Sequence, residues 1–150
     1  MRRPFLLLAC LALVLGGGAL IAQVAGPGEW YAHLRKPGFN PPDWIFAPVW
    51  TVLYVAIAVA GWRIFTRASS SAAMALWTIQ LALNFAWAPV FFRAHRIDLA
   101  LAIATMLSAA VIAFIAITWQ RDRSSALLLV PYAAWSAFAT ALNGAILRLN

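Results

Sequence analysis

The sequence predicts an all-α membrane protein, a single domain built as a bundle of five transmembrane helices. The chain has 150 residues, of which 65% are apolar and only 10% are charged, whereas a soluble domain carries about 25% charged residues. A domain of this size cannot bury so many apolar side chains in one core, so the surplus requires an apolar solvent. The apolar residues also form long runs without alternation, which favours helices over a transmembrane barrel.

Five runs have the length of a membrane-spanning helix, which needs about 20 residues to cross about 30 Å of hydrocarbon. They extend over residues 5–25, 44–65, 72–92, 97–119 and 126–147. The first run follows Arg2-Arg3, a pair that also occurs in export signals. The apolar region of a signal peptide is usually about 7–15 residues long, so we expect this longer run to be an uncleaved first helix.

The charge and cysteine content excludes several classes of protein. The formal net charge is +7, but the positive residues are scattered among short loops and form no basic stripe. They predict anchoring to lipid headgroups rather than nucleic-acid binding, and their nearly equal division between the two faces does not orient the chain. The composition also excludes a soluble enzyme and a disordered chain. A lone Cys10 excludes a disulfide-stapled module.

One long loop is expected, at residues 26–43, between the first two helices. Pro37 and the Pro41-Pro42 pair exclude a single continuous helix there. A long loop that retains aromatic side chains is expected to pack on the fold as a lid does. An ordinary interfacial loop is the alternative. The aromatic residues of the predicted lid are Trp30, Tyr31 and Phe39.

Seven of the eight tryptophans divide into two groups by depth, and Trp77 fits either an interfacial belt or helix packing. An interfacial belt explains those at helix ends and in the loop. Trp50, Trp87 and Trp135 lie deeper, all in the half of the membrane nearest the long loop. Tyr54 follows Trp50 by four residues and Asn84 precedes Trp87 by three, so each pair shares a helix face.

These deep aromatic residues are accompanied by polar and small ones. An amide such as that of Asn84 is costly against lipid, so it is expected to face the bundle interior. The fifth helix carries a stripe made of Tyr132, Trp135, Ala139 and Leu142. Large rings, a small residue and a few polar groups suit a flat, mostly apolar ligand. The alternative is that these residues only pack helix against helix.

Prolines and small residues inside the runs carry further expectations. Pro48, Pro89 and Pro131 interrupt apolar runs, and such breaks are tolerated where neighbours or a cavity satisfy the backbone. Ala82 and Ala86 have the spacing that permits close helix approach, hence a dimer contact on the third helix.

Signals for catalysis and metal binding are weak. His33 and His95 are isolated, and no spacing of Cys, His and acidic residues predicts a metal site. Asp98 is expected to cap the fourth helix rather than to act as a base. The residues themselves therefore predict no metal, no required cofactor and no catalytic group.

Many short motifs in this chain resemble those of the TspO/MBR family, the tryptophan-rich sensory proteins and the mitochondrial translocator protein (peripheral benzodiazepine receptor). The first loop and second helix read Trp30-Tyr31, Leu34, Lys36-Pro37, Pro41-Pro42, Pro48-Val49-Trp50 and Leu53-Tyr54. The third helix reads Gln80-Leu81-Ala82-Leu83-Asn84, Trp87, Pro89 and Phe91-Phe92. The fifth reads Pro131-Tyr132, Trp135, Ala139-Thr140 and Leu142-Asn143.

The resemblance implies a multi-pass protein of a bacterial cell-envelope membrane, with a pocket beneath the first loop for porphyrins such as protoporphyrin IX. Sterols and synthetic benzodiazepine-type ligands are further ligands of the family, and bacterial members form homodimers through the third helix. Matching positions imply that the ligand contacts Trp50, Asn84, Trp135, Ala139 and Leu142, with Phe46, Ala47, Leu99, Ala102 and Met106 as further walls. The sterol motif of the family has a Tyr after the residues that match Leu142-Asn143, and this chain has no Tyr there.

Three functions follow as hypotheses. The first is a membrane receptor or carrier for tetrapyrroles with a regulatory or stress-sensing role. The second is an enzyme that degrades porphyrin with light or oxygen, in which Trp30 and Trp50 would assist. The third is a porphyrin or sterol transporter, which ranks last because five helices cannot form two equal repeats and the spans hold no midplane acid.

Overall fold

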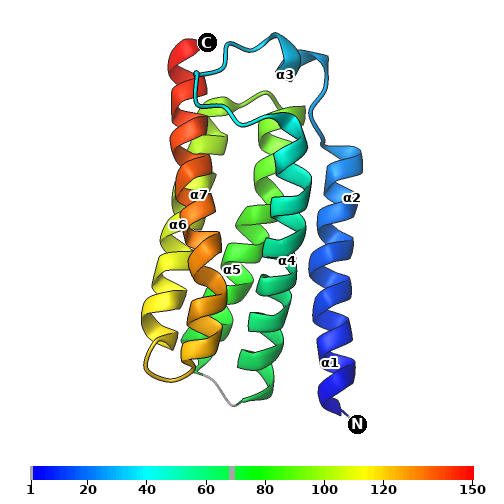
Figure 1. The fold of residues 1–150 in the computed structure, drawn as a ribbon, viewed down its shortest axis with the longest axis vertical. Coiled ribbons are helices and arrows are strands. Elements are labelled where there is room, and N and C mark those ends of the chain that lie inside the picture. The colour runs from blue at the N-terminus through cyan, green and yellow to red at the C-terminus, as the bar shows by residue number, and fades with distance from the viewer. Residues whose placement is uncertain (1, 68–69) are drawn as a thin grey trace.

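A computed structural model describes residues 2–67 and 70–150 of the chain (Figure 1). Over these ranges the secondary structure is helical and includes no strand. The α-helices are α1 (Arg2–Leu11), α2 (Gly17–Val24), α3 (Glu29–His33), α4 (Asp43–Thr66), α5 (Ser71–Ala88), α6 (Ile97–Thr118) and α7 (Arg123–Leu149). Two π-helical segments, η1 (Ala12–Gly16) and η2 (Pro89–Arg93), join α1 to α2 and extend α5.

Five segments within the described ranges are long and apolar enough to cross a membrane. They are Pro4–Val24, Asp43–Thr66, Ser71–Arg93, Ile97–Thr118 and Arg123–Leu149. The predicted fold class, an all-α membrane protein with five transmembrane helices, is confirmed. The protein is an integral, multi-pass membrane protein.

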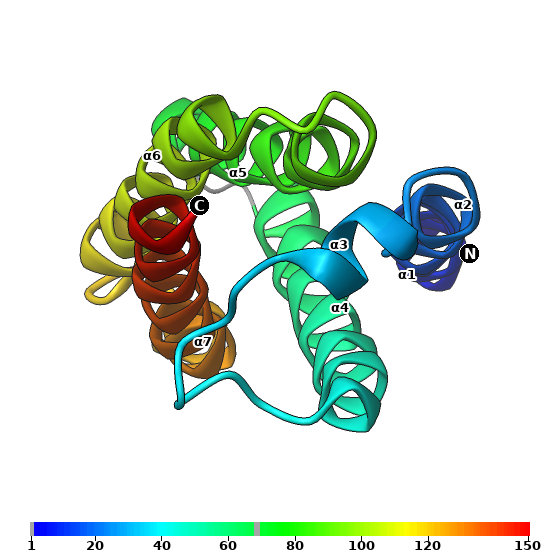
Figure 2. The same ribbon diagram turned by 90° about the horizontal axis from the view of Figure 1, so that it is seen from above.

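The five spans stand side by side, and the long loop crosses one end of the bundle (Figures 1 and 2). Helix α6 packs against α5 and α7, while α4 packs against α7 and α1. The first span lies at the edge of the bundle, beside α4 and α5. From α3 the loop passes over the end of α7 and returns to the start of α4 (Figure 2).

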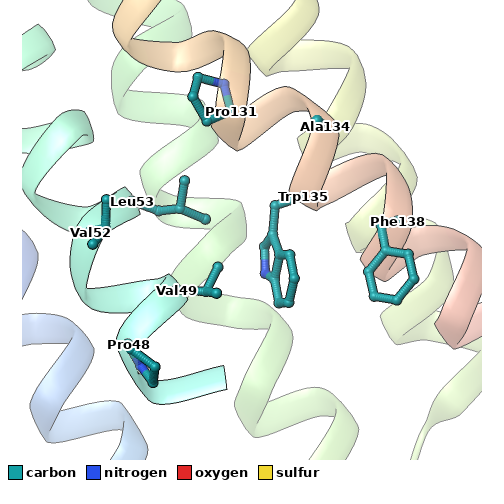
Figure 3. A pocket seen from close by; sticks show the side chains of 8 residues that line it. All are labelled: Pro48, Val49, Val52, Leu53, Pro131, Ala134, Trp135 and Phe138. Atoms are coloured by element: carbon teal, nitrogen blue, oxygen red, sulfur yellow. The ribbon is translucent and has the colours of Figure 1, made fainter. Parts of the chain in front are cut away.

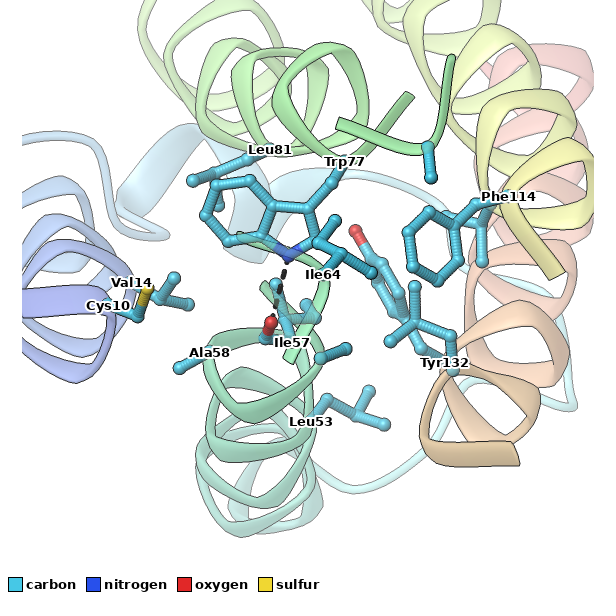
Figure 4. Packing of buried hydrophobic residues seen from close by; sticks show 14 of the residues in the cluster. Cys10, Val14, Leu53, Ile57, Ala58, Ile64, Trp77, Leu81, Phe114 and Tyr132 are labelled. Carbon is cyan, nitrogen blue, oxygen red and sulfur yellow. Dashed lines mark hydrogen bonds between the residues drawn. The ribbon is translucent and has the colours of Figure 1, made fainter. Parts of the chain in front are cut away.

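The buried core lies where α1, α4, α5, α6 and α7 meet (Figure 4). Trp77 is part of this core rather than of an interfacial belt, since only 3% of it is exposed. Its indole nitrogen donates a hydrogen bond to the Ile57 carbonyl at 2.9 Å. The close approach requires glycine at position 61, because a Cβ on Gly61 would overlap the Trp77 ring.

At the end of the bundle opposite the loop, a partly buried cluster of polar side chains joins α4 to α7. Arg63 Nη2 lies 2.6 Å from Asp122 Oδ1, and Arg63 Nε donates to Ser125 Oγ at 3.1 Å. The Ser125 hydroxyl in turn donates to Asp122 Oδ2 at 2.6 Å. Burial alone would raise the pKa of Asp122, but the hydrogen bonds from Arg63 and Ser125 outweigh it, and the pKa is lowered. Helix α7 begins at Arg123, three residues before the apolar run that starts at residue 126.

We predict that Asp122→Asn destabilises the protein by about 1.5–3 kcal/mol near neutral pH, the usual value of hydrogen bonds to a charged group. Because folding lowers the pKa of Asp122, the carboxylate stabilises the fold above its unfolded pKa. That stabilisation is lost as the pH falls through the lower folded pKa. Thermal unfolding in detergent, measured from pH 7 downward, should show the gap between the two proteins closing only in acid.

Asp98→Asn is the matched control, since the Asp98–Arg96 ion pair is exposed, at 57% and 60% for the two side chains. Exposed pairs contribute little to stability, so this variant should unfold close to the wild-type temperature. Equal losses of stability in the two variants would contradict a structural role for the partly buried cluster.

Candidate functional site

The predicted lid packs on the bundle through its aromatic side chains. The Trp30 ring stacks on His95 with centroids 4.1 Å apart and meets Phe91 edge-on at 5.7 Å. Tyr31 contacts Phe91 and Phe92 edge-on, at 6.1 and 5.3 Å. His95 has a φ of 54°, which is uncommon for a residue other than glycine. The first half of the lid is thus seated on η2 and the turn that follows it.

The second half of the lid is attached to α7. The backbone N–H of Arg35 donates to Asn150 Oδ1, and Asn150 Nδ2 donates back to the Arg35 carbonyl, both at 3.0 Å. Farther along, the Phe39 ring meets Phe138 of α7 edge-on at 6.2 Å. Lys36 holds the lid internally, because its ammonium donates to the Tyr31 carbonyl at 2.8 Å. Partial burial, and then the charge of Asp43, raise the pKa of the Tyr31 phenol.

A hydrogen-bonded network beneath the lid joins three helices. The Tyr54 hydroxyl of α4 donates to Asn84 Oδ1 of α5 at 3.0 Å. Asn84 Nδ2 donates to the Tyr132 hydroxyl of α7 at 2.8 Å. Asn84 therefore faces the interior, as its polarity requires, and Tyr132 is fully buried. The Trp50 ring lies against both tyrosines, with centroid distances of 5.3 and 6.2 Å.

A second polar link lies nearer the lid. Trp87 donates through its indole nitrogen to Asn143 Oδ1 at 3.1 Å, and Asn143 Nδ2 donates to the Ile97 carbonyl at 3.1 Å. This chain connects α5, α7 and α6. Sequence reasoning singled out Trp87 but not Asn143. The sequence does mark Asn143, because its side-chain amide lies within an apolar run, as that of Asn84 does, and such an amide is costly against lipid.

A cavity of about 630 Å³ lies between α4 and α7 (Figure 3). Its walls are almost wholly apolar, and they are formed by Pro48, Val49, Val52, Leu53, Pro131, Ala134, Trp135 and Phe138. The Trp135 ring is flanked by Phe46 at 5.8 Å and Phe138 at 5.5 Å. Two of the prolines that interrupt apolar runs therefore border this cavity.

The indole nitrogen of Trp135 is buried and has no hydrogen-bond partner among the described residues. Figure 3 shows this edge of the ring turned toward Val49 of α4. An unpaired buried donor costs about 1–3 kcal/mol. Two buried acceptors, Gln80 Oε1 and Asn40 Oδ1, are likewise unpaired within the described ranges, but neither residue lines this cavity. Trp135 therefore supplies an unused donor at the wall of an apolar space.

The predicted site residues divide between this cavity and its surroundings. Trp135 lines the cavity and Phe46 packs on it, whereas Trp50, Tyr54 and Asn84 belong to the polar network. Leu142 is buried in a cluster with Phe91 and Ile97 beneath the lid, and Ala139 is partly buried on α7. The structure does not bring the remaining predicted walls to this cavity. These four residues are exposed: Ala47 on α4, and Leu99, Ala102 and Met106 on α6.

Helix α6 supplies no residue to the cavity. The face of α6 that carries Leu99, Ala102 and Met106 points away from the bundle, and Met106 is 52% exposed. Sequence reasoning missed most of the apolar lining, including Val52 and Ala134. Such residues are indistinguishable from lipid-facing ones by type. Among the lining residues, Trp135 and the two prolines marked the place in the sequence. No group of three or more His, Cys, Asp or Glu side chains suited to a metal occurs among the described residues.

We predict that Gly18→Val weakens the polar network beneath the lid. A Cβ on Gly18 would overlap the Tyr54 ring, so Tyr54 must shift away from Asn84, at a cost of about 1–3 kcal/mol for overpacking. Gly16→Val is the matched control, because nothing lies within 4 Å of a Cβ built there. Thermal unfolding in detergent should show a lower midpoint for Gly18→Val alone. Equal midpoints for the two variants would contradict the close packing of the first span on Tyr54.

Comparison with known proteins places this arrangement in a family. The profile of the TspO/MBR family matches residues 6–149. The chain is 38% identical to the tryptophan-rich sensory protein of Cereibacter sphaeroides, over 90% of this chain and 85% of that protein. It is 39% identical to the human translocator protein, over 85% and 79% of the two chains. It is 38% identical to the tryptophan-rich protein TspO of Archaeoglobus fulgidus, over 96% and 94%. The chain therefore belongs to the TspO/MBR family.

Proposed function

We propose that this protein is a membrane receptor or carrier that binds porphyrins, such as protoporphyrin IX, beneath its lid. The observation that carries the proposal is the unpaired indole donor of Trp135 in the wall of an apolar, aromatic-lined cavity. Small-molecule sites are usually apolar spaces of about 300–1,000 Å³ with a few placed polar groups. A cavity of about 630 Å³ with one free donor has these properties.

The aromatic side chains favour a flat ligand. Trp135 and Phe138 line the cavity and contact each other, Phe46 packs on Trp135, and Phe39 of the lid packs on Phe138. Rings of this size bind other π-systems by offset stacking or edge-on contact. A porphyrin is large, flat and mostly apolar, and its pyrrolenine nitrogens can accept a hydrogen bond from the Trp135 N–H.

The charges at the lid end suit the acidic side chains of a porphyrin. Arg35 and Lys36 lie on the lid, and Arg148 is exposed near the end of α7. Arg93 ends η2 at the same end of the bundle. Carboxylates are costly in hydrocarbon but not at its polar boundary, where these cations lie.

The names of the relatives agree with a sensing or carrying role, since they include a tryptophan-rich sensory protein and translocator proteins.

The proposal also covers the location and the assembly of the protein. We propose that it lies in a bacterial cell-envelope membrane and forms a homodimer through α5, where Ala82 and Ala86 are exposed. Small residues on an exposed face permit close helix contact. Sterol binding has less support, because no Tyr follows Asn143 in the fifth helix.

Porphyrin degradation is less well supported than binding. Trp30 packs on His95 and Phe91, and it does not line the cavity between α4 and α7. Trp50 lies against the two tyrosines of the polar network. Among the described residues, the ring contacts of Trp30 and Trp50 include no carboxylate that could serve as a general acid or base.

We predict that Trp135→Phe weakens protoporphyrin IX binding about tenfold, which corresponds to about 1.4 kcal/mol and to the loss of one hydrogen bond. This substitution keeps an aromatic ring and removes the donor. Trp44→Phe, at a position that is 73% exposed, is the control and should bind as the wild type does. Affinity is measured from the absorbance of the porphyrin, titrated with protein in lipid nanodiscs. Unchanged affinity in Trp135→Phe would overturn the role of this donor.

A further inference from the structure

Gln80 is a buried amide of α5 whose acceptor is unpaired. Its side chain is fully buried, and Gln80 Nε2 donates to the Trp77 carbonyl at 2.8 Å. A carbonyl oxygen only accepts, so this bond fixes which end of the amide is nitrogen and which is oxygen. Gln80 Oε1 is therefore an acceptor, and it has no partner among the described residues. Buried acceptors are almost always paired with protein or with ordered water, so an unpaired one points to a bound group.

Tyr132 of α7 lacks the complementary partner. Its side chain is also fully buried, and its hydroxyl accepts from Asn84 Nδ2 at 2.8 Å. The amide of Asn84 presents its nitrogen to Tyr132 and its oxygen to the Tyr54 hydroxyl. A phenol hydroxyl also carries one hydrogen that it can donate. Within the described ranges the Tyr132 hydroxyl makes no hydrogen bond as a donor.

These two incomplete groups lie in the same part of the core. Gln80 and Asn84 are four residues apart on α5, so they share one helix face and their Cβ atoms are about 5–6 Å apart. The Asn84 amide touches the Tyr132 hydroxyl. Figure 4 shows that hydroxyl directed toward α5, between Trp77 and Phe114. An unpaired acceptor on α5 and an unpaired donor on α7 are therefore about one helical turn apart, without a direct bond between them.

The chemistry of the two groups selects the molecule that joins them. Core side chains packed around Tyr132 include Ile57, Val111, Phe114 and Leu129, which are fully buried and offer no hydrogen-bonding atom. The missing partner must accept from the Tyr132 hydroxyl and donate to Gln80 Oε1. A metal cation cannot accept a hydrogen, an anion cannot donate one, and an ammonium ion only donates. Water does both.

We propose that one water molecule is bound in the core between α5 and α7, accepting from the Tyr132 hydroxyl and donating to Gln80 Oε1. It completes a chain of hydrogen bonds that runs from Tyr54 through Asn84 and Tyr132 to Gln80. The fully buried apolar side chains around it make its exchange with bulk water slow. By fixing the direction of the Tyr132 hydroxyl, the water holds the polar network on which Trp50 lies. This water is independent of the proposed porphyrin site, because neither Gln80 nor Tyr132 lines the cavity between α4 and α7.

The first experiment detects the water directly by NMR. Full-length protein labelled with ¹⁵N-glutamine, in perdeuterated lipid nanodiscs, is examined for cross-relaxation between water protons and the side-chain amides of its three glutamines. The Gln80 amide should show the signal of a long-lived bound water, whereas the exposed amides of Gln23 and Gln120 should show only rapid exchange with solvent. Tyr132→Phe should abolish the Gln80 signal. Tyr54→Phe, which removes the hydroxyl on the other side of Asn84, is the matched control and should retain it.

The second experiment measures the coupling of the two residues through the water. Gln80→Met and Tyr132→Phe each remove one partner of the water, and each should lower the thermal unfolding midpoint in detergent by about 2–4 °C, the shift expected for one hydrogen bond. The double variant should lose clearly less than the sum of the two shifts, because either substitution alone already releases the water. Gln80→Met combined with Tyr54→Phe should lose the full sum.

Three results would overturn the proposal: no slow-water signal at Gln80, a signal that persists in Tyr132→Phe, or additive losses in the double variant of Gln80 and Tyr132. If Gln80→Met does not fold, the spectra of the wild type, Tyr132→Phe and Tyr54→Phe decide the question. Both experiments are done without porphyrin. Porphyrin titrations of the same samples therefore test the proposed function separately, and failure of one proposal leaves the other standing.

Discussion

The structure depends on one constraint: a polar group inside hydrocarbon must find its partner within the protein. Trp77 meets this requirement by donating to a carbonyl of α4, and Asn143 by bridging Trp87 to the start of α6. Asn84 does so by joining Tyr54 to Tyr132. Each of these bonds runs between helices, so satisfying the polar groups also sets which helices are neighbours and how they are rotated. Apolar packing alone would specify this weakly, because lipid is as apolar as a leucine side chain.

Two glycines permit this network, because a residue without a side chain lets an aromatic ring of a neighbouring helix lie directly against the backbone. Gly61 lies under Trp77 and Gly18 under Tyr54, and in both cases a Cβ would overlap the ring. The two rings carry the donors that join α5 to α4 and α4 to Asn84. The glycine and the polar partner are therefore parts of one arrangement, although they are far apart in sequence. Gly18 lies on the first span, so its close contact with Tyr54 also brings that span, which has few polar residues of its own, against α4 beside the network.

The fold could be predicted from composition and run length, because a span must be long and apolar whatever its neighbours are. The interior position of Asn84 followed from the cost of an amide in lipid. The rotation of α6 could not be predicted, since Leu99 and Met106 have the same apolar character whether they face a ligand or lipid. Most of the apolar lining of the cavity was missed for the same reason, and only Trp135, Pro48 and Pro131 marked it. The attachment of Arg35 to Asn150 joins residues 115 positions apart and leaves no local pattern to detect.

Trp135 departs from the constraint that governs the rest of the bundle, and this makes its position informative. The side chains of Trp77, Asn84 and Asn143 are paired at short range, whereas the Trp135 indole donor has no partner among the described residues and lies beside an open apolar space. Trp77 shows that the fold can supply a backbone acceptor to an indole where stability is the requirement. Under the proposed function, the free donor near the middle of the span and the cations at the lid end would bind different parts of one ligand. The neutral ring nitrogens of a porphyrin would accept from Trp135 in the hydrocarbon, and its acidic groups would remain at the polar boundary beside Arg35, Arg93 and Arg148. Selectivity of this kind arises from where the few polar groups stand rather than from how many there are.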